Sequence, residues 1–192
     1  YITAISSAKP DMVILALGGR NLVPFLKAAK ATGFADRFPI WTHTATELSN
    51  LRALGKDAPL NTVGTSNYHF YYPDTPANKN FVKEFEAAYK RKPAVGALYG
   101  YLAARYVIEG YQKAGKVDSE KLIDAIEGMT VDSPVGKVTL RAYDHQALLP
   151  MFLGVTASDP AYPDFLIAKD IVTVPGAELV LSVEEVKKLR GE

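Results

Sequence analysis

Two short polar stretches that follow apolar runs are the first candidates for ligand chemistry. Gly18-Gly19-Arg20 comes after the run 12–17, and His43-Thr44 comes after the run 39–42. Glycine allows a tight turn and a close backbone approach to a ligand, and Arg20 would add a positive charge for an anion. The plainer alternatives are a strand-to-helix turn at the glycines, a solvated Arg20 and a helix cap at Thr44. Each is favoured when its residue is taken alone.

A second candidate is an aromatic turn between Asn67 and Asp74, which contains Tyr68, Phe70, Tyr71 and Tyr72. Aromatic side chains give a large contact area at low entropic cost, so they suit a pocket wall. A packed linker is the other interpretation, and the sequence leaves both open.

The sequence lacks the residue patterns of metal sites, phosphate-binding loops and nucleophilic catalysis. The chain has no cysteine and only three histidines, His43, His69 and His145, with no metal-binding spacing among them. No phosphate-binding glycine loop and no nucleophile elbow follows any apolar run. Asp144-His145-Gln146 pairs a carboxylate with an imidazole but has no nucleophile, which favours a polar turn. We therefore expect no catalysis, no metal and no cofactor.

Composition narrows the class further. The 192 residues are 48% hydrophobic and 22% charged, with a net charge of +1, as in ordinary globular proteins. A nearly neutral chain lacks the positive charge that nucleic acid binding requires. The longest apolar runs are far shorter than the ~20 residues of a membrane span.

The order of elements predicts an α/β fold with a parallel sheet. We expect buried strands over 12–17, 39–42 and 62–66, with helices between them that end at Gly33 and Gly55. Thr44 and Glu47 have the spacing of a capping box for the second of these helices.

The second half of the chain predicts three helices: one begins at Thr75-Pro76, one spans 95–114, and one runs from Asp118-Ser119 to Gly128. The 95–114 helix is apolar nearly all round, so we expect it to be covered on several sides. A hairpin is expected between 137–140 and 148–155. It is followed by one more apolar segment over 165–174 and a last helix with Ser182 and Glu185 as its capping box.

Taken in order, these segments resemble the ABC-transporter solute-binding proteins of the Leu/Ile/Val-binding type, the type I periplasmic binding proteins. The resemblance is carried by 8–19 with the helix that ends at Gly33, by 71–78, by 81–93, by 99–104, and by 133–138 with 141–147. Together these segments cover most of the chain.

The resemblance implies two three-layer α/β lobes joined by three crossovers, with a solute held in the cleft. Residues 1–63 and 135–192 would then belong to the second lobe, and 67–130 would return to the first lobe. The rest of the first lobe would be absent from the chain, as would a signal peptide. We therefore expect a fragment, a proteolytic product or the ordered part of a longer protein.

The resemblance also implies the ligand-binding residues. They are expected at Gly18, Gly19, Arg20, His43 and Thr44, with wall positions at Tyr68, Phe70 and Tyr99. Amino acid binders of this family carry a tyrosine and an acidic residue at the two lobe-two loops, where this chain has glycine and Thr44. A buried ammonium without a carboxylate is costly, so this departure favours a small organic or aromatic acid, with Arg20 as its partner.

By this resemblance the protein is a periplasmic or other extracytoplasmic solute-binding subunit of an ABC importer. Its partners would be a small organic acid or an amino-acid-like solute and a membrane permease. Two alternatives stay open, a ligand-sensing receptor domain of the same fold and a doubly wound nucleotide-binding enzyme. The second is weakened by the missing third glycine and the missing ribose-binding acid. In a member of this family, the apolar faces over 81–112 would pack on first-lobe strands, which this chain would lack. We therefore expect the isolated chain to self-associate through these faces.

Overall fold

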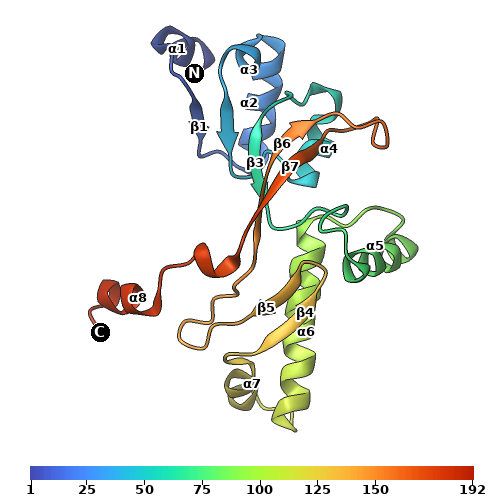
Figure 1. Cartoon of the computed structure of the whole chain (residues 1–192), viewed down its shortest axis with the longest axis vertical. Coiled ribbons are helices and arrows are strands. Elements are labelled where there is room, and N and C mark those ends of the chain that lie inside the picture. Colours follow the sequence, from blue (N-terminus) through green and yellow to red (C-terminus); the bar gives the residue numbers. More distant parts are fainter. The chain divides into compact units, whose positions relative to one another are not determined.

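A computed structural model describes all of residues 1–192, which form two compact units (Figure 1). Unit 1 comprises Tyr1–Ser66 and Phe152–Thr173, and unit 2 comprises Asn67–Met151 and Val174–Glu192. The chain therefore passes between the units after Ser66, after Met151 and after Thr173.

Unit 1 is built on a five-stranded sheet with the order β1-β2-β3-β6-β7. β1, β2 and β3 are parallel, as the sequence predicted, and β6 is antiparallel to β3. The strands are β1 (Val13–Leu15), β2 (Ile40–Thr42), β3 (Val63–Ser66), β6 (Met151–Ala157) and β7 (Ile167–Val174). The helices are α1 (Ile2–Ala8), α2 (Gly19–Ala31), α3 (Phe34–Arg37), α4 (Leu48–Leu54) and the 3-10 turn η1 (Gly55–Asp57).

The core of unit 1 lies between α2 and one face of the parallel strands. Leu22, Leu26 and Ala29 recur at helical spacing, so they share one face of α2, and all three are buried. They belong to the same cluster as Val13 and Leu15 of β1. This packing fixes the first turn of α2 at the end of β1.

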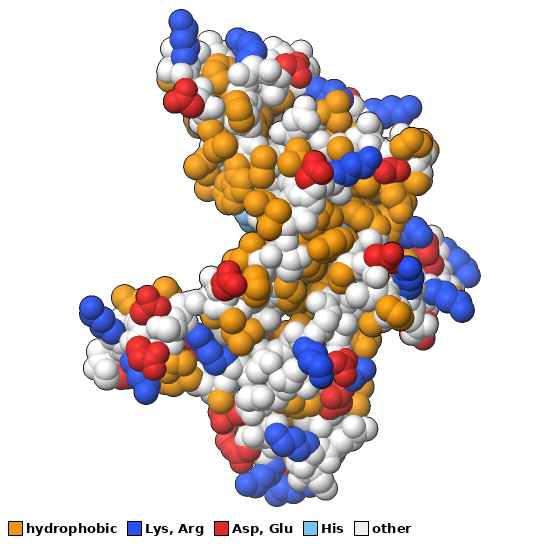
Figure 2. Space-filling model, in the orientation of Figure 1, with side chains coloured by type: hydrophobic (Ala, Val, Ile, Leu, Met, Phe, Trp, Pro, Cys, Tyr) orange, Lys and Arg blue, Asp and Glu red, His pale blue; other side chains and the backbone are white.

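The other face of β1 is exposed, so the prediction of a fully buried strand is wrong. Ile14 is 70% exposed and Met12 is 50% exposed. Successive side chains of a strand point to opposite faces, and the cluster with α2 covers only the face of Val13 and Leu15. Figure 2 shows hydrophobic side chains gathered on this flank of unit 1.

Unit 2 combines helices with a two-stranded sheet of β4 and β5. Its elements are α5 (Pro76–Tyr89), α6 (Val95–Ala114), α7 (Ser119–Ile126), β4 (Thr130–Ser133), β5 (Gly136–Thr139), the 3-10 turn η2 (Gly176–Glu178) and α8 (Val183–Arg190). Three predicted caps are confirmed: Thr75 caps α5 with Pro76 in its first turn, Asp118 caps α7, and Ser182 forms a capping box with Glu185.

The long helix α6 holds unit 2 together. A β-carbon at Gly110 would lie only 2.5 Å from Leu122 Cδ1, so the glycine permits the close approach of α7. The buried hydroxyl of Tyr106 donates a hydrogen bond of 2.7 Å to the carbonyl of Val138 in β5. Val107 and Ile108 remain 46% and 56% exposed, so α6 is covered on fewer sides than its composition predicted.

Two local predictions are wrong. β5 pairs with β4 and not with 148–155, whose strand β6 pairs with β3 in unit 1. Only an isolated bridge between Leu140 and Ala147 remains of the predicted hairpin. The Thr44–Glu47 capping box is also absent, because α4 begins one turn later with Glu47 itself as the N-cap.

The compact units differ from the grouping expected for the lobes. Of the range 135–192, only Phe152–Thr173 packs with the first 66 residues. Residues 135–151 lie in unit 2, where the β4–β5 hairpin packs on α6. Residues 174–192 also lie in unit 2, where Arg141 Nη1 donates to the carbonyl of Leu181. The correspondence of the units to the lobes of a family member stays a prediction.

Candidate functional site

The carboxyl ends of β1 and β2 bring the first two candidate segments side by side in unit 1. Leu15 of β1 is in register with Thr42 of β2. The hydroxyl of Thr42, which is fully buried, donates to the carbonyl of Leu17 at 3.4 Å. The loops at Gly18 and His43 therefore leave the sheet at one edge, where parallel α/β sheets bind their ligands.

The first turn of α2 is open at this edge. Gly18 is the N-cap, and no side chain bonds to the N–H groups of the first turn. Gly19 has a φ of +51°, which favours glycine, and a β-carbon there would meet nothing within 4 Å. A helix start carries a partial positive charge and free N–H donors, so this end of α2 attracts anions.

Arg20 and His43 stand beside this helix start. Both are exposed, and no protein group forms a hydrogen bond or an ion pair with the guanidinium of Arg20. A β-carbon at Gly18 would lie 3.6 Å from His43 Cε1, so the imidazole lies against the helix cap. The hydroxyl of Thr65 donates to the carbonyl of His43 at 2.5 Å and holds this loop to β3.

The hydroxyls of Thr44 and Thr46 are unused. The Oγ1 atoms of both residues are buried and lack a hydrogen-bond partner. The carboxylate that could have paired with Thr44 caps α4 instead: Glu47 accepts from Ser49 N at 3.0 Å and from Ser49 Oγ at 3.2 Å. An unpaired buried hydroxyl costs about 1–3 kcal/mol, and a ligand oxygen or a water would recover that energy for Thr44.

These groups can do one kind of chemistry. A guanidinium, an imidazole and the N–H groups of a helix start are donors of positive or partial positive charge, and the Thr44 hydroxyl can donate as well. The carboxylate of Glu47, in the same loop as His43 and Thr44, accepts from Ser49 instead. The edge of unit 1 is therefore suited to hold an anion such as a carboxylate, and it lacks a base paired with a nucleophile.

The aromatic turn belongs to unit 2 and has a different character. Tyr68 and Phe70 are 1% and 6% exposed. The Tyr68 ring meets the Phe81 ring edge to face at 5.9 Å. The packed-linker interpretation is the one that this burial favours. Burial also raises the pKa of the Tyr68 phenol above its usual value.

Asn78 locks this turn from the first turn of α5. Its side-chain oxygen accepts from the Tyr68 hydroxyl at 2.9 Å. Its amide nitrogen donates to the carbonyls of Phe70 at 3.3 Å and Pro73 at 3.1 Å. His69 is 2% exposed and stacks on Tyr71. Desolvation lowers the pKa of His69 to about 4, so the imidazole is neutral in the folded protein.

Tyr99, the third predicted wall position, lies near the start of α6 and is 46% exposed. Its hydroxyl donates to Asn67 Oδ1 at 2.7 Å, and Asn67 Nδ2 donates to the carbonyl of Pro150 at 2.8 Å. Asn67 and Pro150 flank the points where the chain passes between the units. Tyr99 thus fixes two connecting segments within unit 2.

The structure brings together Gly18, Gly19, Arg20, His43 and Thr44 in unit 1, and it places Tyr68, Phe70 and Tyr99 in unit 2. Sequence reasoning passed over Thr65, Thr46 and Asn78. Thr65 could have been predicted as part of the site, since the predicted strand 62–66 ends at the same sheet edge. Asn78 had a signal as well, because it stands three residues after the N-cap Thr75.

No group of three or more His, Asp or Glu side chains is arranged to hold a metal ion. No helix has both the length and the apolar character that crossing a bilayer requires.

Relatives of the chain were found among curated proteins and solved structures. It is 26% identical over 159 residues to the Leu/Ile/Val-binding protein homolog 4 of Brucella melitensis, a match that covers 79% of this chain and 36% of that protein. A branched-chain amino acid ABC transporter structure from Rhodopseudomonas palustris is 28% identical, with a TM-score of 0.71, covering 95% of this chain and 48% of that one.

A solute-binding protein from Rhodopseudomonas palustris, solved in complex with 3,4-dihydroxybenzoic acid, shares the fold. Its TM-score is 0.79 at 20% identity, covering 96% of this chain and 49% of that one. The chain thus spans about a third of the curated relative and about half of these solved structures. The family model for periplasmic binding proteins matches residues 1–159. The type I periplasmic binding protein fold is confirmed, and the chain belongs to the periplasmic binding protein family.

Proposed function

We propose that this chain is part of the solute-binding subunit of an ABC importer and that it works outside the cytoplasm. The family consists of substrate-binding proteins, which are not enzymes, and the unit 1 edge lacks a nucleophile paired with a base. The proposed partners are one small-molecule solute and the membrane permease that receives it. The ligand-sensing receptor domain remains the alternative within the same fold.

The observation that carries the proposal is the open start of α2 beside Arg20. No side chain caps the first turn of α2, where Asn21 N donates to the carbonyl of Gly18, so the N–H groups of Gly19 and Arg20 can serve a ligand together with the Arg20 guanidinium and the unused Thr44 hydroxyl. A carboxylate supplies two acceptor oxygens and a negative charge, and charge-assisted bonds of this kind are the stronger ones. We therefore propose Gly18, Gly19, Arg20, His43 and Thr44 as the carboxylate-binding residues.

The solute class that fits is a small organic acid, with an aromatic acid as the leading case. The neighbours solved with 3,4-dihydroxybenzoic acid and 4-hydroxybenzoate support it as an analogy of fold. Tyr68, Phe70 and Tyr99 stay predicted wall positions, although the first two rings are already buried in this chain.

An amino acid is the second candidate. It is favoured by a relative from Pseudomonas aeruginosa that is named a leucine-, isoleucine-, valine-, threonine- and alanine-binding protein, 27% identical over 113 residues. An ammonium group needs a carboxylate partner when it leaves water. At the unit 1 edge the carboxylate of Glu47 is committed to α4, so the partner would have to come from elsewhere.

Native mass spectrometry of the full-length protein tests this proposal, followed by calorimetry on the ligand-free protein with 4-hydroxybenzoate and leucine. We expect a co-purified acid and binding of the aromatic acid alone. Binding of leucine alone would show that the solute is an amino acid and would contradict the proposed organic acid. Absence of any bound or titratable small solute would contradict the importer subunit.

A further inference from the structure

A cavity of about 210 Å³ lies within unit 2, on the side of α5 that faces the β4–β5 hairpin. Its lining residues come from α5, α6 and the end of β4: Ala77, Asn80, Phe81, Glu84, Tyr101, Asp132, Ser133 and Pro134. The four residues from α5 are spaced at i, i+3, i+4 and i+7, so they share one face of the helix. No lining residue belongs to the sheet edge of unit 1, so the cavity is a separate feature of the molecule.

Two aromatic rings form the apolar wall of this cavity. Phe81 and Tyr101 meet edge to face, with their ring centres 5.2 Å apart. The Tyr101 hydroxyl accepts from Arg105 Nη1 at 3.1 Å, and Arg105 also pairs with Glu109, so this guanidinium is balanced by a carboxylate outside the cavity. An aromatic ring packs against hydrocarbon and carries partial negative charge on its face. The wall therefore suits an apolar group that bears a positive charge.

Glu84 supplies a carboxylate on the α5 side of the cavity. Asn80, one turn earlier in the helix, donates from Nδ2 to Glu84 Oε1 at 2.9 Å and orients the carboxylate. Glu84 Oε2 has no partner in the chain. The amide of Asn80 carries no charge, so the negative charge of Glu84 is left without a cation.

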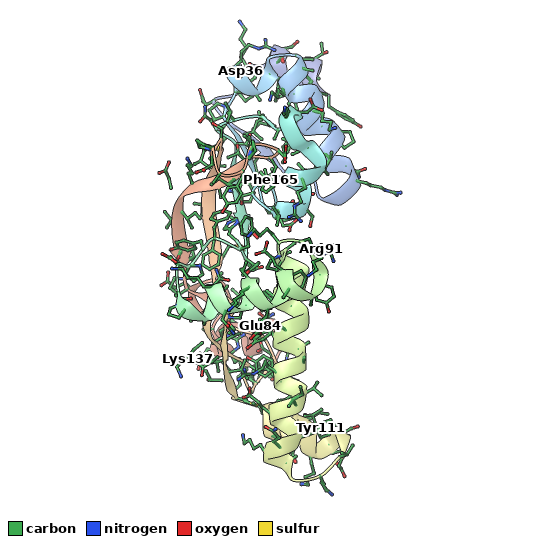
Figure 3. All side chains as sticks on the ribbon, turned by 90° about the vertical axis from the view of Figure 1, so that its right-hand side faces the viewer. Asp36, Glu84, Arg91, Tyr111, Lys137 and Phe165 are labelled. Carbon is green, nitrogen blue, oxygen red and sulfur yellow. The ribbon has the colours of Figure 1, made fainter.

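Asp132 supplies a second carboxylate from the hairpin. The next residue, Ser133, is buried and donates from Oγ to the carbonyl of Gly136 at 2.6 Å, which ties the turn that carries Asp132. Lys137, labelled together with Glu84 in Figure 3, lies 3.6 Å from Asp132, and both side chains of this pair are 78% exposed. Ion pairs so exposed contribute little, so a bound cation can compete with Lys137 for Asp132.

We propose that this cavity binds a small primary alkylammonium, with its ammonium group bonded to Glu84 and Asp132 and its hydrocarbon chain against Phe81 and Tyr101. The lining contains two carboxylates and no Lys, Arg or His, so its charge is complementary to a cation. An ammonium group has three N–H donors, and hydrogen bonds between a cation and a carboxylate are the stronger ones. The proposal goes beyond the importer function and does not depend on it, because no residue of the proposed carboxylate-binding edge takes part.

An NMR titration of the full-length protein with n-butylammonium chloride tests this site. We expect saturable shifts of the backbone amides at 77–84, 101 and 131–134, with a dissociation constant on the order of 1 mM for so small a ligand. 1-Butanol, a neutral compound of the same chain length, should not give saturable shifts. Tetramethylammonium, which has no N–H donor, should bind about tenfold more weakly than n-butylammonium.

Two variants remove one negative charge each with little change of shape, Glu84→Gln and Asp132→Asn. Each should weaken n-butylammonium binding about tenfold, the loss expected for one charge-assisted hydrogen bond. Both side chains are exposed, so both variants should melt at the temperature of the parent protein. Glu120→Gln is the matched control, because Glu120 is an exposed carboxylate of α7 outside the cavity. This control should keep the parent affinity.

Four results would overturn the proposal. Absence of saturable shifts at the cavity would show that no ammonium binds there, and equal shifts with 1-butanol would show an apolar crevice that does not select charge. Equal affinity for tetramethylammonium would contradict the role given to the N–H donors. Equal weakening by Glu84→Gln, Asp132→Asn and Glu120→Gln would show an effect of net charge alone.

Discussion

The sheet edge of unit 1 and the aromatic turn of unit 2 were both predicted as binding surfaces, yet their polar groups differ in whether they have partners within the protein. At the edge, the Arg20 guanidinium and the Thr44 hydroxyl have no partner in the chain. In the turn, one side chain, Asn78, makes hydrogen bonds to Tyr68, Phe70 and Pro73. The polar groups at the edge can therefore still form hydrogen bonds with a solute, whereas those of the turn already bond to one another.

This difference separates two consequences of mutation. Changes in the turn should lower the stability of unit 2, because buried polar groups lose their partners. Removing the exposed Arg20 side chain at the edge should leave stability nearly intact and alter binding, because an exposed group without a partner contributes little to folding.

Asn78→Ala should have the largest effect. It leaves the Tyr68 hydroxyl and the carbonyls of Phe70 and Pro73 without a partner, for a loss of about 3–5 kcal/mol in the free energy of unfolding. Asn80→Ala is the control, because Asn80 is exposed and bonds only to Glu84, one turn further along α5. It should cost less than about 0.5 kcal/mol. Urea denaturation of both variants makes the comparison, and equal losses would contradict the locking role of Asn78.

Acid should destabilise unit 2 through His69. Burial lowers the pKa of His69 to about 4, so between pH 6.5 and 4 the unfolded chain binds a proton that the folded protein does not. Stability from this residue is fully present above pH 6.5 and falls as the pH drops toward 4, by up to about 3 kcal/mol. His69→Gln should remove this slope. A variant whose denaturation midpoint falls with acid as steeply as that of the parent would contradict the assignment.

Gly64→Ala should disturb the sheet edge itself. A β-carbon at Gly64 would lie 2.7 Å from Ala45 Cβ and 2.8 Å from Thr46 N, so the loop after β2 must shift, at a cost of about 1–3 kcal/mol. Gly100→Ala on the exposed face of α6 meets nothing within 4 Å. It should be neutral or stabilise by up to about 1 kcal/mol. Thermal melting of the pair checks the difference, and a neutral Gly64→Ala would mean that the edge tolerates displacement.

Local signals predicted most of the elements. The caps of α5, α7 and α8 depend on residues three or four positions apart, so the sequence alone identified Thr75, Asp118 and Ser182. The parallel strands followed from the alternation of apolar runs and helices, and that alternation correctly placed the loops at Gly18 and His43 along one edge of the sheet.

The features that were mispredicted depend on contacts between residues far apart in the sequence or on a choice between alternative partners. The run 148–155 looked like the partner of the preceding strand, but its partner is β3, 92 positions earlier in the register Val63–Val155. The burial of Tyr68 depends on Asn78, and the unused hydroxyl of Thr44 depends on Glu47 capping α4 instead. Which of several possible partners a strand or side chain takes is decided by tertiary packing, so the spacing of residues along the sequence does not predict it.

Calorimetry with one aromatic acid on two variants of the full-length protein tests the central claim, that the edge of unit 1 binds the carboxylate of the solute. Arg20→Ala should weaken binding by about 1.5–3 kcal/mol, the worth of a hydrogen bond to a charged group, with no change in melting temperature. Tyr68→Phe, which removes the hydroxyl bonded to Asn78, should keep the affinity and lower the stability. The reverse result, an unchanged affinity in Arg20→Ala and a weakened one in Tyr68→Phe, would contradict the account.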